Sequence, residues 1–253
     1  MIPYTVIIRF YNGYDKLDRV LHTWRSQTFK PTTLLFVDNG SDIPLDLSSE
    51  RDCKVIRTER TDSIARSTNI GVENCETECF ILANDDTLVN IGYVREMFEI
   101  SNPNTMVFPI ARFEIPSNSE IAPWGKIGDV RYDKDNWKFT HPHHAFEYYS
   151  TFQTPTPHDG ALHFKQSWLW CNEALDGYGF QDSEYYFRWV IMQRRVFRTT
   201  GAVMFHLAHD DLLTRQESPA RQKNWELFMN LLNSYKQTGK LPMLTSTNRV
   251  YFP

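Results

Sequence analysis

Long apolar runs are missing from this sequence. No segment approaches the roughly 18 uninterrupted apolar residues that a membrane-spanning helix needs, so no membrane span is predicted. The N-terminus leads directly into Tyr4-Thr5-Val6-Ile7-Ile8, a strand-like run too short for the apolar core of a signal peptide. We therefore expect a cytoplasmic protein, or one that docks at the periphery of a membrane.

Cysteine is also scarce, with 4 in 253 residues. Cys53, Cys75, Cys79 and Cys171 form neither a disulfide framework nor the paired motif of a zinc site. Cys75 and Cys79 lie close in sequence but on either side of a predicted helix-to-strand turn, which disfavours a shared metal. Free thiols in a reducing cytosol are the expectation.

An excess of positive charge is absent as well. The formal net charge is −4, which excludes a broad nucleic-acid surface. The best candidate for a local basic patch is Arg194-Arg195 with Arg198.

Strand and helix patterns alternate along the first hundred residues. Apolar, β-branched runs predict strands, and apolar residues at helical spacing predict helices. The predicted strands are 4–9, 33–37, 53–57 and 79–83, and the helices are 15–27, one starting near Asp62-Ser63, and 94–100. Such alternation predicts an α/β fold with a mostly parallel sheet flanked by helices.

The second half is less regular. Residues 112–160 are predicted to form a long irregular excursion with an antiparallel hairpin, typical of substrate loops. Beyond it we expect helices near 165–175, 182–192 and 218–235, and a strand pair at 196–199 and 202–205 around Gly201.

Two predicted strands end in acidic or amide-rich loops. One loop begins at Asp38, and the other is Asn84-Asp85-Asp86. Both emerge at the carboxyl edge of a parallel sheet, where open α/β sheets bind ligands. Carboxylate oxygens suit Mg²⁺ or Mn²⁺, which in turn hold a diphosphate. The alternative for Asn84-Asp85-Asp86 is a solvated turn or a helix N-cap.

Carboxylates also follow the turn Gly177-Tyr178-Gly179-Phe180. Asp182 lies at the start of a predicted helix, whose dipole keeps a carboxylate ionised, so it can act as a general base toward a hydroxyl. The alternative is simple capping by Asp182 with a solvated Glu184.

Histidines and aromatics supply further candidates. His206 and His209 follow a predicted strand, and either could be a metal ligand, whereas the role of His141, His143 and His144 stays undefined. The aromatic share of 14% is high. Sugar-stacking candidates are Trp124, Trp168, Trp170 and Tyr178, although a place in the core is the ordinary role for each.

Together these motifs resemble the GT-A fold inverting glycosyltransferases, of the family 2 type with a galactosyltransferase-like C-terminal motif. The resemblance covers roughly residues 4–210, and its segments are Val6–Asn12, Leu21, Gln27-Thr28, Pro31, Phe36–Asp42, Ala65–Val72, Asn84-Asp85-Asp86, Gly177–Asp182 and His206.

The resemblance implies a role for each matching residue. The first strand with its loop and the acid after the second strand would hold the nucleotide, together with the helix before the acidic motif: Arg9, Phe10, Tyr11, Asn12, Asp38, Arg66 and Asn69. Asn84-Asp85-Asp86 corresponds to the DxD-type motif, with Asp86 on the metal and Asp85 near the ribose. Asp182 corresponds to the base and His206 to a metal ligand. Acceptor contacts would come from Gln181, Glu184, Tyr178 and Trp168.

Three positions depart from the family pattern. Arg9 stands where a proline or small residue is usual, Asn84 replaces the first acid of the DxD pattern, and Gln181 replaces a glutamate. None of these changes removes a group that the reaction requires.

The implied function is a metal-dependent, inverting transfer of the hexosyltransferase type. A sugar would pass from a nucleotide-diphosphate donor, with UDP favoured by analogy, to the hydroxyl of a glycan, a lipid-linked intermediate, a protein or another acceptor, with Mn²⁺ or Mg²⁺ as cofactor. Residues 1–111 would bind the donor, 112–215 would form the acceptor and catalytic half of the same domain, and 216–253 a C-terminal helix and tail.

Two other functions stay open. A nucleotidyltransferase that makes sugar nucleotides usually opens with a Gly-rich phosphate loop, but residues 9–15 contain only Gly13. A non-catalytic nucleotide- or glycan-binding relative would be expected to lose Asp86 or Asp182, and both are present.

Overall fold

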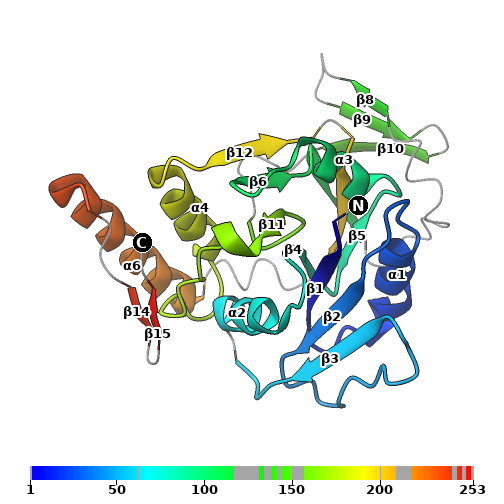
Figure 1. The fold of residues 1–253 in the computed structure, drawn as a ribbon, viewed down its shortest axis with the longest axis horizontal. Coiled ribbons are helices and arrows are strands. Elements are labelled where there is room, and N and C mark those ends of the chain that lie inside the picture. Colours follow the sequence, from blue (N-terminus) through cyan, green and yellow to red (C-terminus); the bar gives the residue numbers. More distant parts are fainter. Residues whose placement is uncertain are drawn as a thin grey trace.

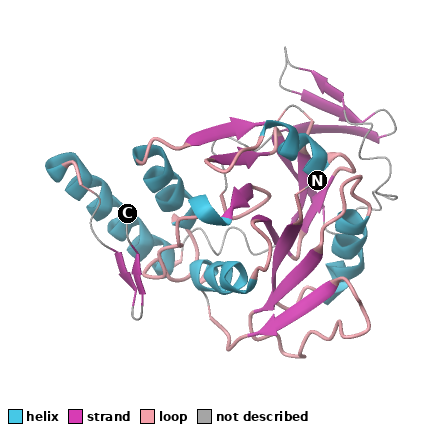
Figure 2. Cartoon of the chain, viewed as in Figure 1, coloured by secondary structure: helices cyan, strands magenta, loops and turns pink. Residues whose placement is uncertain are grey.

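The protein is described from a computed structural model, which covers residues 2–61, 63–116, 131–133, 138–141, 144–149, 157–199, 201–208, 218–240, 244–246 and 249–251. A seven-stranded sheet forms its centre, with helices packed around it (Figures 1 and 2). The strands, in spatial order, are β12 (Arg195–Arg198), β6 (Thr105–Phe108), β11 (Leu162–Phe164), β4 (Cys79–Asn84), β1 (Tyr4–Phe10), β2 (Thr33–Asp38) and β3 (Cys53–Arg57). β11 runs antiparallel to β4 and β6, and the other pairs of this sheet are parallel. The predicted α/β fold with a mostly parallel sheet is confirmed.

The central strands β1, β2, β4 and β6 are buried, and their alternate side chains point to opposite faces of the sheet. On β1, Val6 and Ile8 join a core that includes α1 (Tyr14–Arg25) and α3 (Tyr93–Ile100). Ile7 joins the other core, against α2 (Ile64–Asn74) and α4 (Gln181–Ile191). Each fully buried side chain of this size contributes about 1.5–3 kcal/mol. The same alternation places Arg9 and Asn84 on the α2 face, at the carboxyl ends of β1 and β4.

Smaller sheets flank the central one. β13 (Val203–Ala208) lies between β5 (Thr87–Val89), to which it is antiparallel, and β7 (Ala111–Pro116), to which it is parallel. The predicted antiparallel hairpin is present as β8 (Arg131–Asp133), β9 (Lys138–His141) and β10 (His144–Tyr149). A last hairpin joins β14 (Leu244–Ser246) to β15 (Arg249–Tyr251).

Two predictions for the second half are wrong. Instead of a helix near 165–175, the chain forms a single 3₁₀ turn, η2 (Lys165–Ser167), and continues irregularly. This segment is held by Asn69, whose amide bonds the backbone N–H and carbonyl of Cys171 at 2.8 and 3.0 Å. β12 and β13 are also not partners: β12 pairs with β6, and β13 with β5 and β7.

The last long helix is α6 (Pro219–Thr238), close to the predicted range 218–235, and Ser218 caps its N-terminus. All four cysteines are free thiols, and Cys75 and Cys79 lie on either side of the turn between α2 and β4. Among the described residues, no helix combines the length and apolar character needed to cross a membrane.

Candidate active site

The guanidinium of Arg9 links three elements at the carboxyl edge of the sheet. Arg9 and Asn84 are neighbours in the register of β1 and β4. The Nη2 group of Arg9 donates to Asn84 Oδ1 and, at 2.8 Å, to the carbonyl oxygen of His158. Its Nη1 group donates to Thr68 Oγ1 on α2 at 3.3 Å. Arg9 and Asn84, two of the three departures from the family pattern, are therefore hydrogen-bond partners.

Asp85 lies against the loop that follows β1. Its Oδ2 accepts from the backbone N–H of Tyr11 at 2.9 Å, and its own N–H donates to the Arg9 carbonyl at 3.0 Å. A Cβ on Gly13 would lie 2.5 Å from Asp85 Oδ2, so only glycine leaves room for this carboxylate. Burial and the adjacent Asp86 carboxylate raise the pKa of Asp85 to about 7.

Asp86 meets His206 through the pairing of β5 with β13. Thr87 is the register partner of His206, and the Leu207 N–H donates to the Asp86 carbonyl at 2.9 Å. His206 Nε2 lies 3.2 Å from Asp86 Oδ2, and each residue is only 6% exposed. A carboxylate oxygen beside an imidazole nitrogen is a donor pair that suits Mn²⁺.

If Asp86 and His206 both bound one metal ion, the other coordination positions of that ion would be open to diphosphate oxygens and water. Among the described residues, no group of three or more His, Cys, Asp and Glu side chains has the arrangement of a metal site. His209 and His143 lie outside the described residues, as do the side chains of His141 and His144.

Asp182 lies in the first turn of α4, but it does not cap the helix. The N-cap residue is Phe180, in the left-handed region at φ 67° and without a side-chain cap bond. Asp182 Oδ1 instead accepts from the backbone N–H of His158 at 3.0 Å, and 42% of the side chain is exposed. Partial burial of the carboxyl group raises the pKa of Asp182, and the His158 N–H and the charges of Arg9 and Arg112 partly oppose this effect. A carboxylate fixed on one oxygen and open to solvent can accept a proton.

Sequence reasoning missed His158 and Asp159. Both are buried, and they directly precede Gly160 and β11. Asp159 accepts from Thr87 Oγ1 at 2.8 Å and lies 3.5 Å from the Arg112 guanidinium. The only signal in the sequence was a polar pair before a short apolar run, inside a stretch that looked irregular.

Helix α6 supports the turn that leads into Asp182. The buried Asn224 donates to the carbonyls of Asp176 at 2.8 Å and Gly179 at 3.1 Å. A Cβ on Gly179, which has φ 100°, would lie 2.8 Å from Arg221 Cγ, so glycine permits both the backbone conformation and the close packing of α6. The Phe180 ring packs on Trp225 with centroids 5.1 Å apart.

Most of the residues predicted to contact the acceptor are instead bonded to, or packed against, other residues of the protein. Gln181 donates to the carbonyls of Leu175 and Gly177. Glu184 is 1% exposed and pairs with Arg188 at 2.7 and 2.9 Å. Trp168, 8% exposed, packs in the core against Phe80 and Tyr185. Tyr178 is half-buried in the turn before α4.

Some of the predicted nucleotide-binding residues are also buried and bonded to other parts of the protein. Phe10 and Asn69 are buried, and the Asn69 amide is occupied by residues 171 and 173. Asp38 is also buried, where it accepts from Arg57 at 2.6 Å and from the Ser41 N–H at 2.9 Å. Its pKa is lowered because these bonds outweigh the opposing effect of its burial.

Three others lie at the same edge of the sheet, where Tyr11 and Arg66 are exposed and Asn12 is half-buried. Tyr11 is exposed, with the Arg60 guanidinium 4.8 Å from its ring centroid. Asn12 exchanges two 2.9 Å hydrogen bonds with Asp42, which joins the loops after β1 and β2. Arg66 is exposed at the start of α2.

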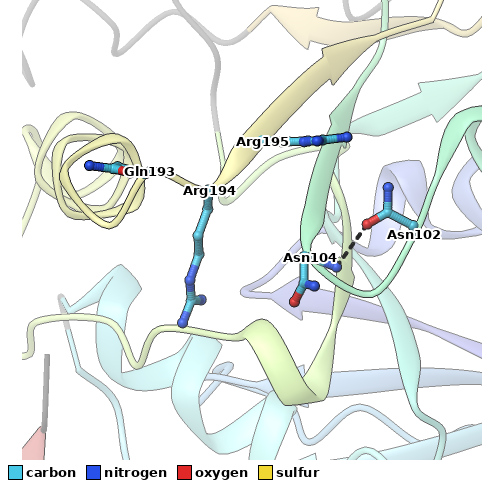
Figure 3. A pocket seen from close by; sticks show the side chains of 5 residues that line it. All are labelled: Asn102, Asn104, Gln193, Arg194 and Arg195. Carbon is cyan, nitrogen blue, oxygen red and sulfur yellow. Dashed lines mark hydrogen bonds between the residues drawn. The ribbon is translucent and has the colours of Figure 1, made fainter.

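A separate hollow of about 550 Å³ is lined by Asn102, Asn104, Gln193, Arg194 and Arg195 (Figure 3). It lies where β6 and β12 begin. Because β4 and β6 are both antiparallel to β11, this end is opposite to the carboxyl end of β4. Arg194 there donates to the Ser167 carbonyl and lies 5.0 Å from the Trp189 ring centroid. Arg194 and Arg195 of the predicted basic patch thus lie at the opposite edge of the sheet from the carboxyl end of β4, whereas Arg198 lies at the other end of β12.

Comparison with known proteins identifies the family of this chain. The model of the family described as "Glycosyl transferase family 2" matches residues 5–168, more than half of the chain. No curated protein sequence matches the chain significantly.

Among solved structures, GalNAc-T7 with UDP, GalNAc and Mn²⁺ has a TM-score of 0.63 at 14% identity, covering 91% of this chain and 48% of that one. S. aureus TarS 1–349 in complex with UDP-GlcNAc has a TM-score of 0.64 at 13% identity, covering 95% of this chain and 68% of that one. A longer TarS chain is matched over only 41% of its length. This chain therefore spans about half or less of the full relatives, and the likeness to them concerns the fold. The chain belongs to glycosyl transferase family 2, a family of glycosyltransferases, and has the GT-A fold.

Proposed function

We propose that the protein transfers a sugar from a nucleotide-diphosphate donor, a UDP-sugar, to an acceptor hydroxyl with inversion at the anomeric carbon. The observation that carries this proposal is the convergence of two unlike groups at one sheet edge. Asp86 and His206 bring a carboxylate oxygen and an imidazole nitrogen together in a buried place, where they could bind a metal ion. Asp182, in contrast, is a solvent-accessible carboxylate held by the His158 N–H. A donor site and a base in one place are what direct glycosyl transfer requires.

The relatives support the choice of donor and cofactor. The GalNAc-T7 crystal contains UDP, GalNAc and Mn²⁺, and the TarS fragment contains UDP-GlcNAc. In this chain, Asp86 and His206 would hold Mn²⁺ or Mg²⁺. When bound, that ion would offset the charge on the leaving diphosphate.

The chain's own residues supply the remaining steps. Asp182 accepts the proton of the acceptor hydroxyl while that oxygen bonds to the anomeric carbon, and the bond from this carbon to the diphosphate oxygen breaks. A single displacement from the opposite face inverts the anomeric configuration. Asp85, whose Oδ2 accepts from the Tyr11 N–H and lies against Gly13, is adjacent to Asp86 and would accept a hydrogen bond from a ribose hydroxyl. The acceptor is a glycan, a lipid-linked intermediate, a protein or another hydroxyl compound.

The test compares wild type with Asp182→Asn, supplied with Mn²⁺, a panel of nucleotide sugars and hydroxyl acceptors. We expect the substitution to lower transfer by about 10²–10⁴-fold, the usual contribution of a general base, with UDP affinity unchanged. Asp176→Asn is the matched control, because this exposed acid contacts the neighbouring Gly177 N–H. Full transfer by Asp182→Asn, or a product with retained configuration, would refute the mechanism.

A further inference from the structure

One residue, His158, joins the carboxyl edge of the sheet to Asp182, the proposed base. The carbonyl of His158 accepts from Arg9 Nη2 at 2.8 Å, and the N–H of the same residue donates to Asp182 Oδ1 at 3.0 Å. Arg9 Nη2 also bonds Asn84 Oδ1. A continuous set of hydrogen bonds thus runs from β4 through β1 to α4 and ends on the catalytic carboxylate.

The side chain of His158 cannot provide the charge that Asp182 needs. The ring is 2% exposed, with Nε2 3.2 Å from Cys171 Sγ and Nδ1 3.5 Å from Asp182 Oδ1. Burial holds the pKa of His158 well below its ordinary value, so the imidazole is neutral near neutral pH. The neighbouring Cys171 thiol is also neutral, because burial raises its pKa.

Within the part of the chain that the structure describes, the positive charges of Arg9 from β1 and Arg112 from β7 oppose the rise in the pKa of Asp182. Arg112 is shared with the buried carboxylate of Asp159, 3.5 Å away. Arg9 is bonded to a neutral amide, a neutral hydroxyl and a carbonyl instead. An aspartate at position 84 would form an ion pair with Arg9 and cancel its charge, whereas Asn84 leaves that charge to act on Asp182.

We propose that Arg9 is a positioning residue for Asp182. It fixes the main chain of His158 that holds the carboxylate, and its charge, left uncancelled by Asn84, favours the ionised base. The inference rests on the proposed function insofar as Asp182 is the base. Arg9 would therefore act mainly on the chemistry of the acceptor side, and not on the nucleotide.

The experiment is the pH profile of kcat/KM for transfer, measured for wild type, Arg9→Met, Arg9→Lys and Asn84→Asp. Loss or cancellation of the charge should raise the pH midpoint of the acid limb by about half a unit in Arg9→Met and Asn84→Asp. At pH values well below the midpoint, kcat/KM of these two variants should therefore fall by about threefold more, relative to wild type, than it does on the pH plateau. Arg9→Lys retains the charge and should keep the wild-type midpoint.

Thr68→Val is the matched control, because it removes the Nη1 partner while keeping the Arg9 charge and the His158 contact. Its midpoint should equal that of wild type. A raised donor KM with unchanged midpoints in Arg9→Met and Asn84→Asp would overturn the proposal and make Arg9 a donor contact. Unchanged midpoints together with an unchanged KM would also overturn it.

A second readout separates this inference from the proposed function. If wild type transfers no sugar, the proposed function fails, but the titration of Asp182 can still be followed by ¹³C NMR of its carboxyl carbon, assigned by comparison with Asp182→Asn. The midpoint should rise in Arg9→Met and Asn84→Asp by the same amount as above. An unmoved midpoint in this measurement would overturn the role of Arg9 whatever the enzyme activity.

Discussion

His206 Nε2 lies 3.2 Å from Asp86 Oδ2, although the two residues belong to distant parts of the chain. The antiparallel pairing of β5 with β13 brings them together, with Thr87 opposite His206. Both residues are buried, and the register of β5 with β13 holds the segments that carry them side by side.

We first predict that His206→Ala weakens Mn²⁺ binding by at least about tenfold, since even the loss of a group that only orients a metal ligand has this effect. The activation of transfer by added Mn²⁺, after treatment with EDTA, measures the change. His22→Ala is the matched control, because His22 is exposed on α1. The same Mn²⁺ dependence in His206→Ala and wild type would exclude this residue as a ligand.

The second prediction concerns Gly13→Ala. The new Cβ would lie 2.5 Å from Asp85 Oδ2 and displace that carboxylate, so we expect UDP affinity to fall by about tenfold, the equivalent of 1.4 kcal/mol. Isothermal titration calorimetry measures it. Gly92→Ala provides the control, because its nearest contact would be the flexible end of Arg95 at 3.5 Å. Equal UDP affinity for both variants would show that Asp85 does not contribute to the nucleotide site.

The third prediction is a pH dependence of stability in the metal-free protein. The pKa of Asp85 is raised to about 7 in the folded state, so the folded state binds this proton more tightly than the unfolded chain does. Its contribution to the free energy of unfolding is therefore complete below the ordinary carboxyl pKa and is lost as pH rises to about 7. In EDTA, Tm should fall more between about pH 5 and pH 8 for wild type than for Asp85→Asn. Parallel Tm curves would contradict the raised pKa.

A fourth prediction tests the support that α6 gives to the catalytic turn. Asn224→Ala leaves the carbonyls of Asp176 and Gly179 without this donor, at a cost of about 1–3 kcal/mol. We expect lower stability in urea and a reduced kcat, while the Kd of UDP stays unchanged because α6 contacts the turn before Asp182. Asn230→Ala on the exposed side of α6 should change neither quantity. A normal kcat in Asn224→Ala would separate α6 from catalysis.

Local sequence patterns were sufficient for the first half of the fold. The strands β1 to β4 and helices α1 and α2 follow from apolar periodicity, and Ser63 caps α2 as expected, accepting from the Arg66 N–H at 3.2 Å. β11 could not be predicted, because it is only three residues long and is defined by pairing with β4 and β6. The apolar segment after it resembled a helix, but its backbone is held by contacts with Asn69 instead.

By itself, the sequence determined which residue types stand at the ends of the strands, and therefore the α/β class and the edge where polar groups collect. Only the tertiary structure decided which of these groups meet. The Arg9 to Asn84 bond depends on strand register, the His158 to Asp182 bond on the packing of α4, and the Asp86 to His206 contact on a separate ladder. The tertiary structure also showed that Glu184, Gln181 and Trp168 contact other residues of the protein. Local patterns report the period and polarity of a segment, whereas partners distant in sequence are chosen by the packing of the whole chain.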